Sequence, residues 1–209
     1  FSLSMNLRNP AACILFLLVI TIFGCSDPPP REKKISGLTM GTYYRVILAS
    51  VTPHLEKQAA RRIEKVLNKI NKSMSVFDPE SEISRFNSLP AGRKLCVSPD
   101  FEKVMKICSQ VHELTSGAFD PALAPLINLW GFGTRALPEK IPDKQAIDKA
   151  LSRSGLNRIT MDQQGCLSKD VAGPILNLSA VAKGFAADAI AGELRSLGIT
   201  SFLIDIGGE

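Results

Sequence analysis

Aromatic residues and histidine are scarce in this sequence, which has one tryptophan, two tyrosines and two histidines among 209 residues. It contains no G-x-S-x-G and no H-E-x-x-H segment, which excludes the common signatures of α/β-hydrolases and zinc peptidases. Residues 131–136 fit G-x-G-x-x-A, but no strand precedes them and Pro138 interrupts a following helix, which excludes a Rossmann dinucleotide site.

An excess of one charge sign is also missing. The net charge of +5 does not by itself require a nucleic-acid or membrane partner. Basic residues recur at every fourth position from Lys57 to Lys69, a pattern that is typical of the solvated face of an amphipathic helix. We therefore expect no nucleic-acid partner, although such a face is also suited to phosphates or to an anionic membrane surface.

Cysteine is limited to five residues, of which Cys13 and Cys25 lie near the N-terminus. The other three, Cys96, Cys108 and Cys166, match no zinc-binding spacing. An odd number permits at most one internal disulfide. We expect these three chiefly as small, buried, apolar side chains.

Only one long hydrophobic run is present, the thirteen residues 11–23, and Arg8 precedes it. The run is too short for a comfortable membrane span and is typical of the hydrophobic part of a signal peptide. Cys25 follows I-F-G and precedes S-D-P-P-P, which resembles a bacterial lipobox with an uncommon Ile-Phe pair.

These features predict a lipoprotein signal over 1–24, a lipidated Cys25, a stiff tether over 25–36 and a folded domain over 37–209. The domain would lie on the periplasmic side of a bacterial membrane, inner or outer. A signal that is cleaved conventionally, or not at all, is the alternative.

Periodicity and capping residues predict the elements of the domain. Strands are expected over 38–49 and 201–206 and a hairpin over 158–161 and 166–168. Helices are expected over 52–72, 81–87, 98–117, 143–154 and 180–197, the first three begun by the capping signals Thr52-Pro53, Ser81 and Ser98-Pro99. Residues 116–133 are apolar, interrupted by prolines and glycines, and contain Trp130 and one acid, Asp120. Two interpretations of this stretch remain open: the wall of a ligand pocket, or a buried crossover between two elements.

Lys183 is the most informative single residue. With Ser179 as the N-cap, it falls in the first turn of its helix, where a cation opposes the helix dipole at a cost of about 0.3–1 kcal/mol. A phosphate bound by free backbone N–H groups at this helix start would explain the placement. The alternative is a lysine whose amine extends into solvent.

Four stretches, in order, together resemble one family, and the terminal I-G-G-E is similar to its next motif. They are M-G-T at 40–42, M-S-V-F-D-P-E-S-E-I-S-R-F-N at 74–87, S-G-A-F-D-P…P-L-I-N-L-W-G-F-G at 116–133 and L-N-L-S-A-V-A-K-G-F-A-A-D at 176–188. The family is ApbE, the FAD:protein FMN transferases. The resemblance implies an α+β fold, T-fold-like, with mixed or antiparallel sheets and packed helices, of which this chain would be roughly the first two-thirds, incomplete at the C-terminus.

The implied chemistry is a transfer of FMN. FAD is cleaved at its pyrophosphate, AMP leaves, and FMN is joined through its phosphate to a Thr or Ser hydroxyl of a partner protein, with Mg²⁺ stabilising the transferring group. The family suggests a subunit of a quinone reductase or an Rnf-type complex as the acceptor. Two alternatives remain open: a metal-dependent FAD pyrophosphatase, and a flavin-binding lipoprotein without catalysis.

Site residues follow from the motifs by resemblance. The implied FAD contacts are Met40, Phe77, Ala118, Phe119, Asp120, Asn177 and Lys183. Phe77 stands where the family often has Tyr, and Asn177 replaces an Asp and therefore lacks its charge. The main-chain carbonyl of Ala180 would bind Mg²⁺, and the remaining ligands would lie beyond Glu209, so we expect this chain alone not to turn over FAD.

The leader yields a direct test. Replacing the predicted lipidation residue in Cys25→Ser should abolish fatty-acid labelling of the exported protein and leave the fold intact, because the thiol is the acylated group. Metabolic labelling with a fatty-acid probe, beside the wild-type protein, measures this. Labelling of the Cys25→Ser protein at the wild-type level would exclude Cys25 as the anchor.

Overall fold

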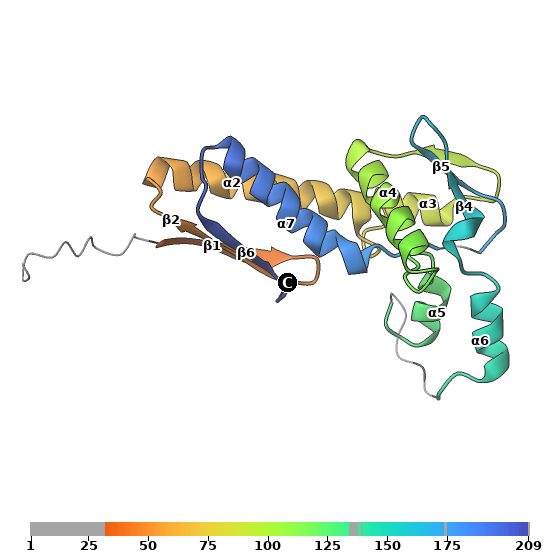
Figure 1. Cartoon of the computed structure of the whole chain (residues 1–209). Helices are drawn as coiled ribbons and strands as arrows, with labels where there is room; N and C mark the ends of the chain where they lie inside the picture. The colour runs from red at the N-terminus through yellow and green to blue at the C-terminus, as the bar shows by residue number, and fades with distance from the viewer. Residues whose placement is uncertain (1–31, 134–137, 139, 174, 209) are drawn as a thin grey trace, which may run out of the picture. The chain divides into compact units, whose positions relative to one another are not determined.

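The computed structural model describes residues 32–133, 138, 140–173 and 175–208. The predicted signal, Cys25 and the first part of the tether lie outside them. The described elements are β1 (Glu32–Thr39), β2 (Thr42–Ala49), α2 (Pro53–Met74), α3 (Glu82–Ser88), β3 (Lys94–Cys96), α4 (Pro99–Leu114), α5 (Ala124–Leu129), α6 (Lys144–Leu151), a 3₁₀ turn (Leu156–Arg158), β4 (Ile159–Met161), β5 (Cys166–Lys169), α7 (Ser179–Ser196) and β6 (Phe202–Ile206) (Figure 1). The predicted α+β class is confirmed. Within this part of the chain, no helix has the length and apolarity needed to cross a bilayer.

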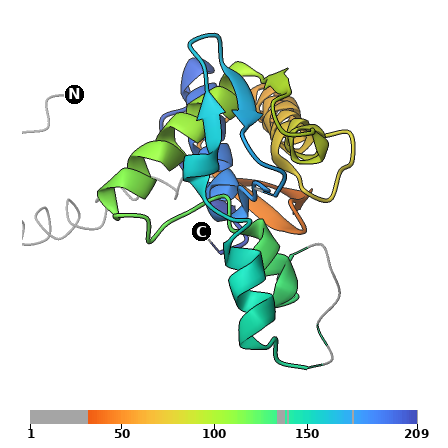
Figure 2. The same ribbon diagram turned by 90° about the vertical axis from the view of Figure 1, so that its right-hand side faces the viewer.

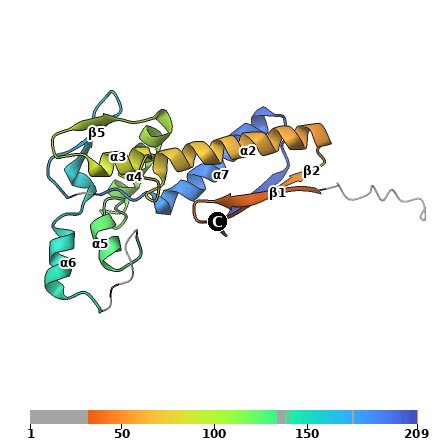
Figure 3. The same ribbon diagram turned by 180° about the vertical axis from the view of Figure 1, so that it is seen from behind.

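The first sheet has the strand order β1-β2-β6, and both pairings are antiparallel. Helices α2 and α7 cover one of its faces, as Figure 3 shows from behind. Val46, Leu48 and Ile206 point toward these helices and are fully buried. The strand predicted at 201–206 is thereby confirmed as the third strand of this sheet.

A tight hairpin replaces the single strand predicted over 38–49. Met40 and Gly41 form its two-residue turn, with φ values of 49° and 73°, and Thr39 pairs with Thr42 on either side. Two consecutive left-handed residues match the twist of antiparallel strands, but the first is rarely a methionine, so local propensities do not predict a turn here. Correspondingly, β1 begins at Glu32, so residues 32–36 belong to an edge strand and not to the tether.

Helices α2 and α7 pack against each other along the sheet. Thr52 caps α2 through a hydrogen bond from the Leu55 N–H to its Oγ1, at 3.3 Å, and Pro53 is the first helical residue, as predicted. The predicted basic face of α2 is exposed. On α7 the buried residues include Ala182 and Ala186, small side chains that let the two helix backbones approach closely.

The Glu82 carboxylate joins α2, α3 and α4. Its Oε2 accepts hydrogen bonds from Ser73 Oγ at 2.6 Å and from Ser98 Oγ at 2.7 Å. Its Oε1 accepts from the Ser98 N–H at 2.8 Å. Because Ser98 is the N-cap of α4, one carboxylate fixes the end of α2 and the beginning of α4 against α3.

Hydrogen bonds of serine residues hold the loop between α2 and α3. The predicted cap Ser81 is fully buried; its Oγ accepts from the Ser84 N–H at 3.1 Å and donates to the Ser75 carbonyl at 2.7 Å. The loop leaves the Phe77 side chain 75% exposed.

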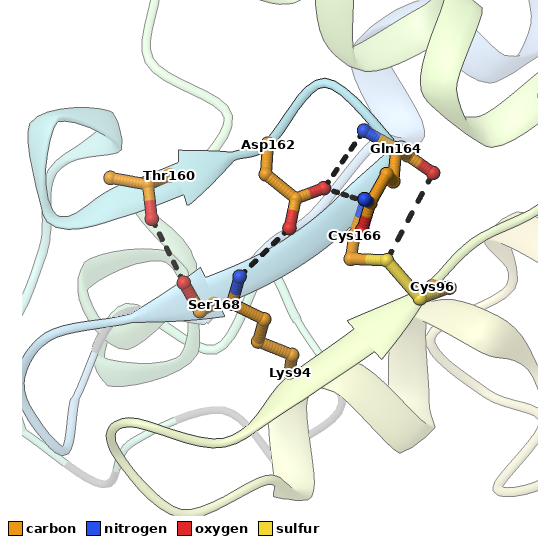
Figure 4. A network of polar contacts seen from close by, with 7 residues as sticks. All are labelled: Lys94, Cys96, Thr160, Asp162, Gln164, Cys166 and Ser168. Atoms are coloured by element: carbon orange, nitrogen blue, oxygen red, sulfur yellow. Dashed lines mark hydrogen bonds and ion pairs between the residues drawn. A yellow bond between two sulfur atoms is a disulfide. The ribbon is translucent and has the colours of Figure 1, made fainter.

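The second sheet, of order β3-β5-β4, contains the predicted hairpin and a short strand, β3, that was not predicted. Cys96 and Cys166 face each other across β3 and β5 and form a disulfide, beside the Asp162 carboxylate that caps the hairpin turn (Figure 4). Our expectation of unpaired, buried cysteines is therefore wrong for this pair, because a strand brings the two sulfurs together. Cys108 fits the expectation, and burial raises the pKa of its thiol to about 11.

Residues 116–133 form a turn followed by α5, which begins just before Pro125. Helix α5 lies side by side with α6, the helix predicted over 143–154, whose N-cap is Asp143 (Figure 2). A parallel bridge joins Leu123 to Ile175, and the Pro121 carbonyl accepts from the Asn177 N–H at 2.8 Å. Of the two interpretations of this stretch, the buried crossover describes its middle part, where Pro121, Ala122 and Ala124 are buried, whereas residues 116–118 are exposed.

Reduction of the disulfide should lower the free energy of unfolding by about 2–4 kcal/mol, because the bond closes a loop between residues 70 positions apart. Urea unfolding with and without reductant measures the difference. The double variant Cys96→Ala/Cys166→Ala is the control and should not respond to reductant. Equal stability of the wild-type protein in both conditions, with reduction verified by mass spectrometry, would contradict a structural role.

Removing the Glu82 carboxylate in Glu82→Ala should lower the free energy of unfolding by about 2–3 kcal/mol, because three partly buried donors lose a charged acceptor. Glu80→Ala is the matched control, since Glu80 is exposed two residues earlier. Chemical denaturation of the two variants compares them. An equal, small decrease in the free energy of unfolding of both variants would show that the Glu82 carboxylate is not needed for stability.

Candidate functional site

A cavity of roughly 290 Å³ lies where the β1–β2 turn, the end of α2 and the beginning of α7 meet. Three separate segments of the chain line it: Met40 and Gly41; Ile70, Asn71, Met74, Ser75, Val76 and Phe77; and Ser179, Ala182 and Lys183. Its wall is mostly apolar, with a few polar groups and one lysine, a composition that is typical of small-molecule sites.

Three residues that the motifs predicted separately meet in this cavity. Met40 comes from the hairpin turn, Phe77 from the loop after α2, and Lys183 from the first half of α7. Met40 is partly buried, whereas the Phe77 ring is largely exposed at this site. The arrangement places an apolar side chain, an aromatic ring and a cation around one space, which suits a ligand with a flat ring and a negative charge.

A polar contact ties the hairpin turn to α2. The Asn71 Nδ2 donates to Thr39 Oγ1 at 3.2 Å, and Thr39 is only 7% exposed. Since Thr39 directly precedes Met40, this bond fixes the turn beside the end of α2. Asn71 was not recognised in the sequence, where it is one polar residue among several on an amphipathic helix.

The start of α7 differs from the prediction. Leu178, not Ser179, is the N-cap, and Lys183 is therefore the fifth helical residue, just past the first turn. The Ser179 N–H donates to Asn177 Oδ1 at 2.9 Å, and the Ala182 N–H donates to the Leu178 carbonyl at 2.9 Å. Because the protein itself satisfies these groups, the helix start offers fewer free N–H donors to an anion than we expected, and Lys183 is its main positive group.

Asn177 lines a second hollow, of roughly 330 Å³. Val76 contributes to both hollows, so they are neighbours. The residues around the second one include three asparagines: Asn87, Asn128 and Asn177. Asn177, a predicted ligand contact, thus lies next to the cavity, and its side-chain oxygen also accepts from the N–H of Ser179, the first residue of α7.

The other three predicted flavin contacts line neither hollow. Ala118 and Phe119 lie in the turn after α4, where the Phe119 carbonyl accepts from His112 Nδ1 at 2.7 Å. The Asp120 carboxylate accepts from the Ala122 N–H at 2.7 Å and the Leu156 N–H at 3.1 Å, and its side chain is 10% exposed. In this structure Asp120 therefore orders the crossover, and contact of these three with flavin stays a prediction.

The described residues do not by themselves fit a magnesium site. No three histidine, cysteine, aspartate or glutamate side chains come together in this part of the chain. Ala180 lies at the exposed start of α7, where the geometry of a helix directs its carbonyl toward the N–H of Gly184. A single neutral carbonyl does not replace the hydration shell of Mg²⁺, so we assign no chemical step to a metal.

Comparison with known proteins agrees with the motifs. An FAD:protein FMN transferase of Vibrio cholerae is 32% identical over 204 residues, which are 97% of this chain and 60% of that protein. One from Haemophilus influenzae is 36% identical over 189 residues, 86% of this chain and 54% of that protein. The chain thus spans less than two-thirds of the length of these relatives.

Solved structures agree as well. The flavin transferase ApbE from Vibrio cholerae superposes with a TM-score of 0.82 at 34% identity, over 86% of this chain and 58% of that one. The flavinyl transferase ApbE of Pseudomonas stutzeri, in its apo form, gives a TM-score of 0.79 at 30% identity, over 86% and 60%. The sequence model of the ApbE family matches residues 40–209, from the hairpin turn onward, and on these grounds the chain belongs to the ApbE family.

Proposed function

We propose that the protein to which this chain belongs is an FAD:protein FMN transferase, with FAD bound in the cavity at the start of α7. The relatives named above carry this activity in their names. The observation that carries the proposal is the meeting of Met40, Phe77 and Lys183, from three distant segments, around one cavity. Each of the three was predicted from a different motif, so their convergence supports a common ligand.

The chemistry of the lining suggests how FAD would lie. FAD has flat aromatic rings and a pyrophosphate with two negative charges. The exposed Phe77 ring offers a surface for stacking, and Met40 offers a polarisable side chain that packs against rings. The Lys183 ammonium would pair with a phosphate in a charge-assisted contact. This contact would also orient the pyrophosphate within the cavity.

The transfer step balances as a displacement at phosphorus. An acceptor hydroxyl oxygen forms a bond to the FMN phosphorus, the bond from that phosphorus to the bridging oxygen breaks, and AMP leaves with that oxygen. The hydroxyl proton is released. Lys183 would stabilise the negative charge that the phosphate oxygens carry through this step, which is the role of positioned cations in phosphoryl transfer.

The acceptor and the location are further parts of the proposal. A Thr or Ser of an exported redox subunit, of the quinone-reductase or Rnf type, would receive the FMN. Lipidation at Cys25 would hold the enzyme at the periplasmic side of the membrane, close to such an acceptor. The lipobox-like sequence before β1 supports this location.

Three outcomes distinguish the candidate activities. The full-length protein is incubated with FAD, Mg²⁺ and a threonine-containing acceptor peptide, and the products are identified by mass spectrometry. Flavinylated peptide together with AMP supports the transferase. Free FMN and AMP without peptide product would instead indicate a pyrophosphatase, and unchanged FAD with retained binding would indicate a flavin carrier.

Lys183→Met in the full-length protein should weaken FAD binding by about 1.5–3 kcal/mol, because a charge-assisted contact to phosphate is lost. Fluorescence titration of FAD measures the affinity, and circular dichroism verifies the fold. Lys65→Met, on the exposed face of α2, is the matched control and should bind FAD as the wild-type protein does. Unchanged affinity in Lys183→Met would remove Lys183 from the site.

A further inference from the structure

Lys169, at the end of β5, is a buried lysine, with only 4% of its surface exposed. Its Nζ donates to the carbonyl oxygen of Asn87 at 2.8 Å and lies 5.5 Å from the centroid of the Phe86 ring. It forms no ion pair with any residue that the structure describes, and burial lowers its pKa. An apolar side chain of equal length would fill this space without the cost of desolvating an amine, so packing alone does not explain a lysine here.

The residue that Lys169 contacts acts on the segment before α7. The side chain of Asn87, near the end of α3, forms two hydrogen bonds with the main chain of Leu176. Its Oδ1 accepts from the Leu176 N–H at 2.8 Å, and its Nδ2 donates to the Leu176 carbonyl at 2.9 Å. Leu176 is fully buried, so its main-chain groups need these partners.

The contacts continue into the cavity wall. Asn177 follows Leu176; its N–H donates to the Pro121 carbonyl, and its Oδ1 accepts from the N–H of Ser179, the first residue of α7. Residues 176–178 belong to no helix or strand, so their path depends on the two bonds from the Asn87 side chain together with these contacts of Asn177. Ser179 and Lys183 then line the cavity.

We propose that Lys169 and Asn87 are positioning residues for the start of α7. The Lys169 amine holds the Asn87 main chain in place, and the Asn87 carboxamide holds residues 176–179 and thereby sets where Lys183 meets its ligand. The link to FAD rests on the proposed function, whereas the effect on residues 176–183 does not.

Hydrogen–deuterium exchange of the ligand-free, full-length protein tests the positioning role without FAD. In Asn87→Ala and in Lys169→Met, peptides covering 175–183 should exchange roughly tenfold faster, while peptides from α4 keep the wild-type rate. Lys169→Met preserves the length and apolar packing of the side chain, so this variant still tests the proposal if Asn87→Ala does not fold. Lys65→Met, an exposed lysine, should change neither region.

Two exchange results would overturn the proposal. One is an unchanged rate in 175–183 in a folded variant. The other is a rise of similar size in all peptides, which would indicate a general loss of stability and no particular effect on the start of α7.

A double-mutant cycle tests the connection to the ligand. Lys183→Met should weaken FAD binding roughly tenfold or more in the wild-type background but about threefold or less in Asn87→Ala, because the lysine there is no longer held in place. If Lys183→Met weakened FAD binding by the same factor in both backgrounds, a positioning role would be contradicted. If Lys183→Met leaves the wild-type affinity unchanged, Lys183 is not part of the FAD site, and the exchange experiment still decides the role of Lys169 and Asn87.

Discussion

The packing of α2 against α7 is the constraint on which the rest of the structure depends. Ile63, Leu67 and Ile70 of α2 and Ala186 and Ile190 of α7 belong to one buried cluster above the first sheet. The small side chains on α7 allow close approach, and an ion pair between Arg62 and Glu193, at 2.6 Å, lies across the two helices. The cavity is situated where this helix pair meets the β1–β2 turn, so the helices determine which residues can meet there.

Polar contacts then fix the irregular segments that complete the site. Glu82 holds the end of α2, Asn71 holds the hairpin turn, and Asn87 holds the segment before α7. Asn87 and Glu82 satisfy main-chain groups outside the regular hydrogen bonding of a helix or sheet, those of Leu176 and the Ser98 N–H, whereas Asn71 donates to a side-chain hydroxyl. The precision of the site therefore comes from carboxamide and carboxylate side chains, most of which do not themselves touch the predicted ligand.

Much of this fold could be predicted from the sequence because short-range signals determine where its helices begin. Thr52-Pro53, Ser81 and Ser98-Pro99 are capping signals that act over three or four residues, and each begins a helix as expected. The motifs likewise identified Met40, Phe77 and Lys183, which line one cavity.

What the sequence did not predict depends on contacts between distant residues or on unusual backbone geometry. The disulfide requires β3, whose three residues pair with a strand some 70 positions away. The hairpin turn uses a methionine at positive φ, which propensities disfavour. Asn87 ends one of the motifs but was given no role there, and Lys169 resembles an ordinary surface residue in the sequence; only their partners in the fold indicate what they do.

The central claim is that FAD binds where the β1–β2 turn, the end of α2 and the start of α7 meet. A crystal structure of the full-length protein with FAD tests it most directly. We predict that the ligand occupies this cavity, with an aromatic ring system beside Met40 and Phe77 and a phosphate within hydrogen-bonding distance of Lys183 Nζ. FAD bound elsewhere on the protein, with this cavity vacant, would contradict the account.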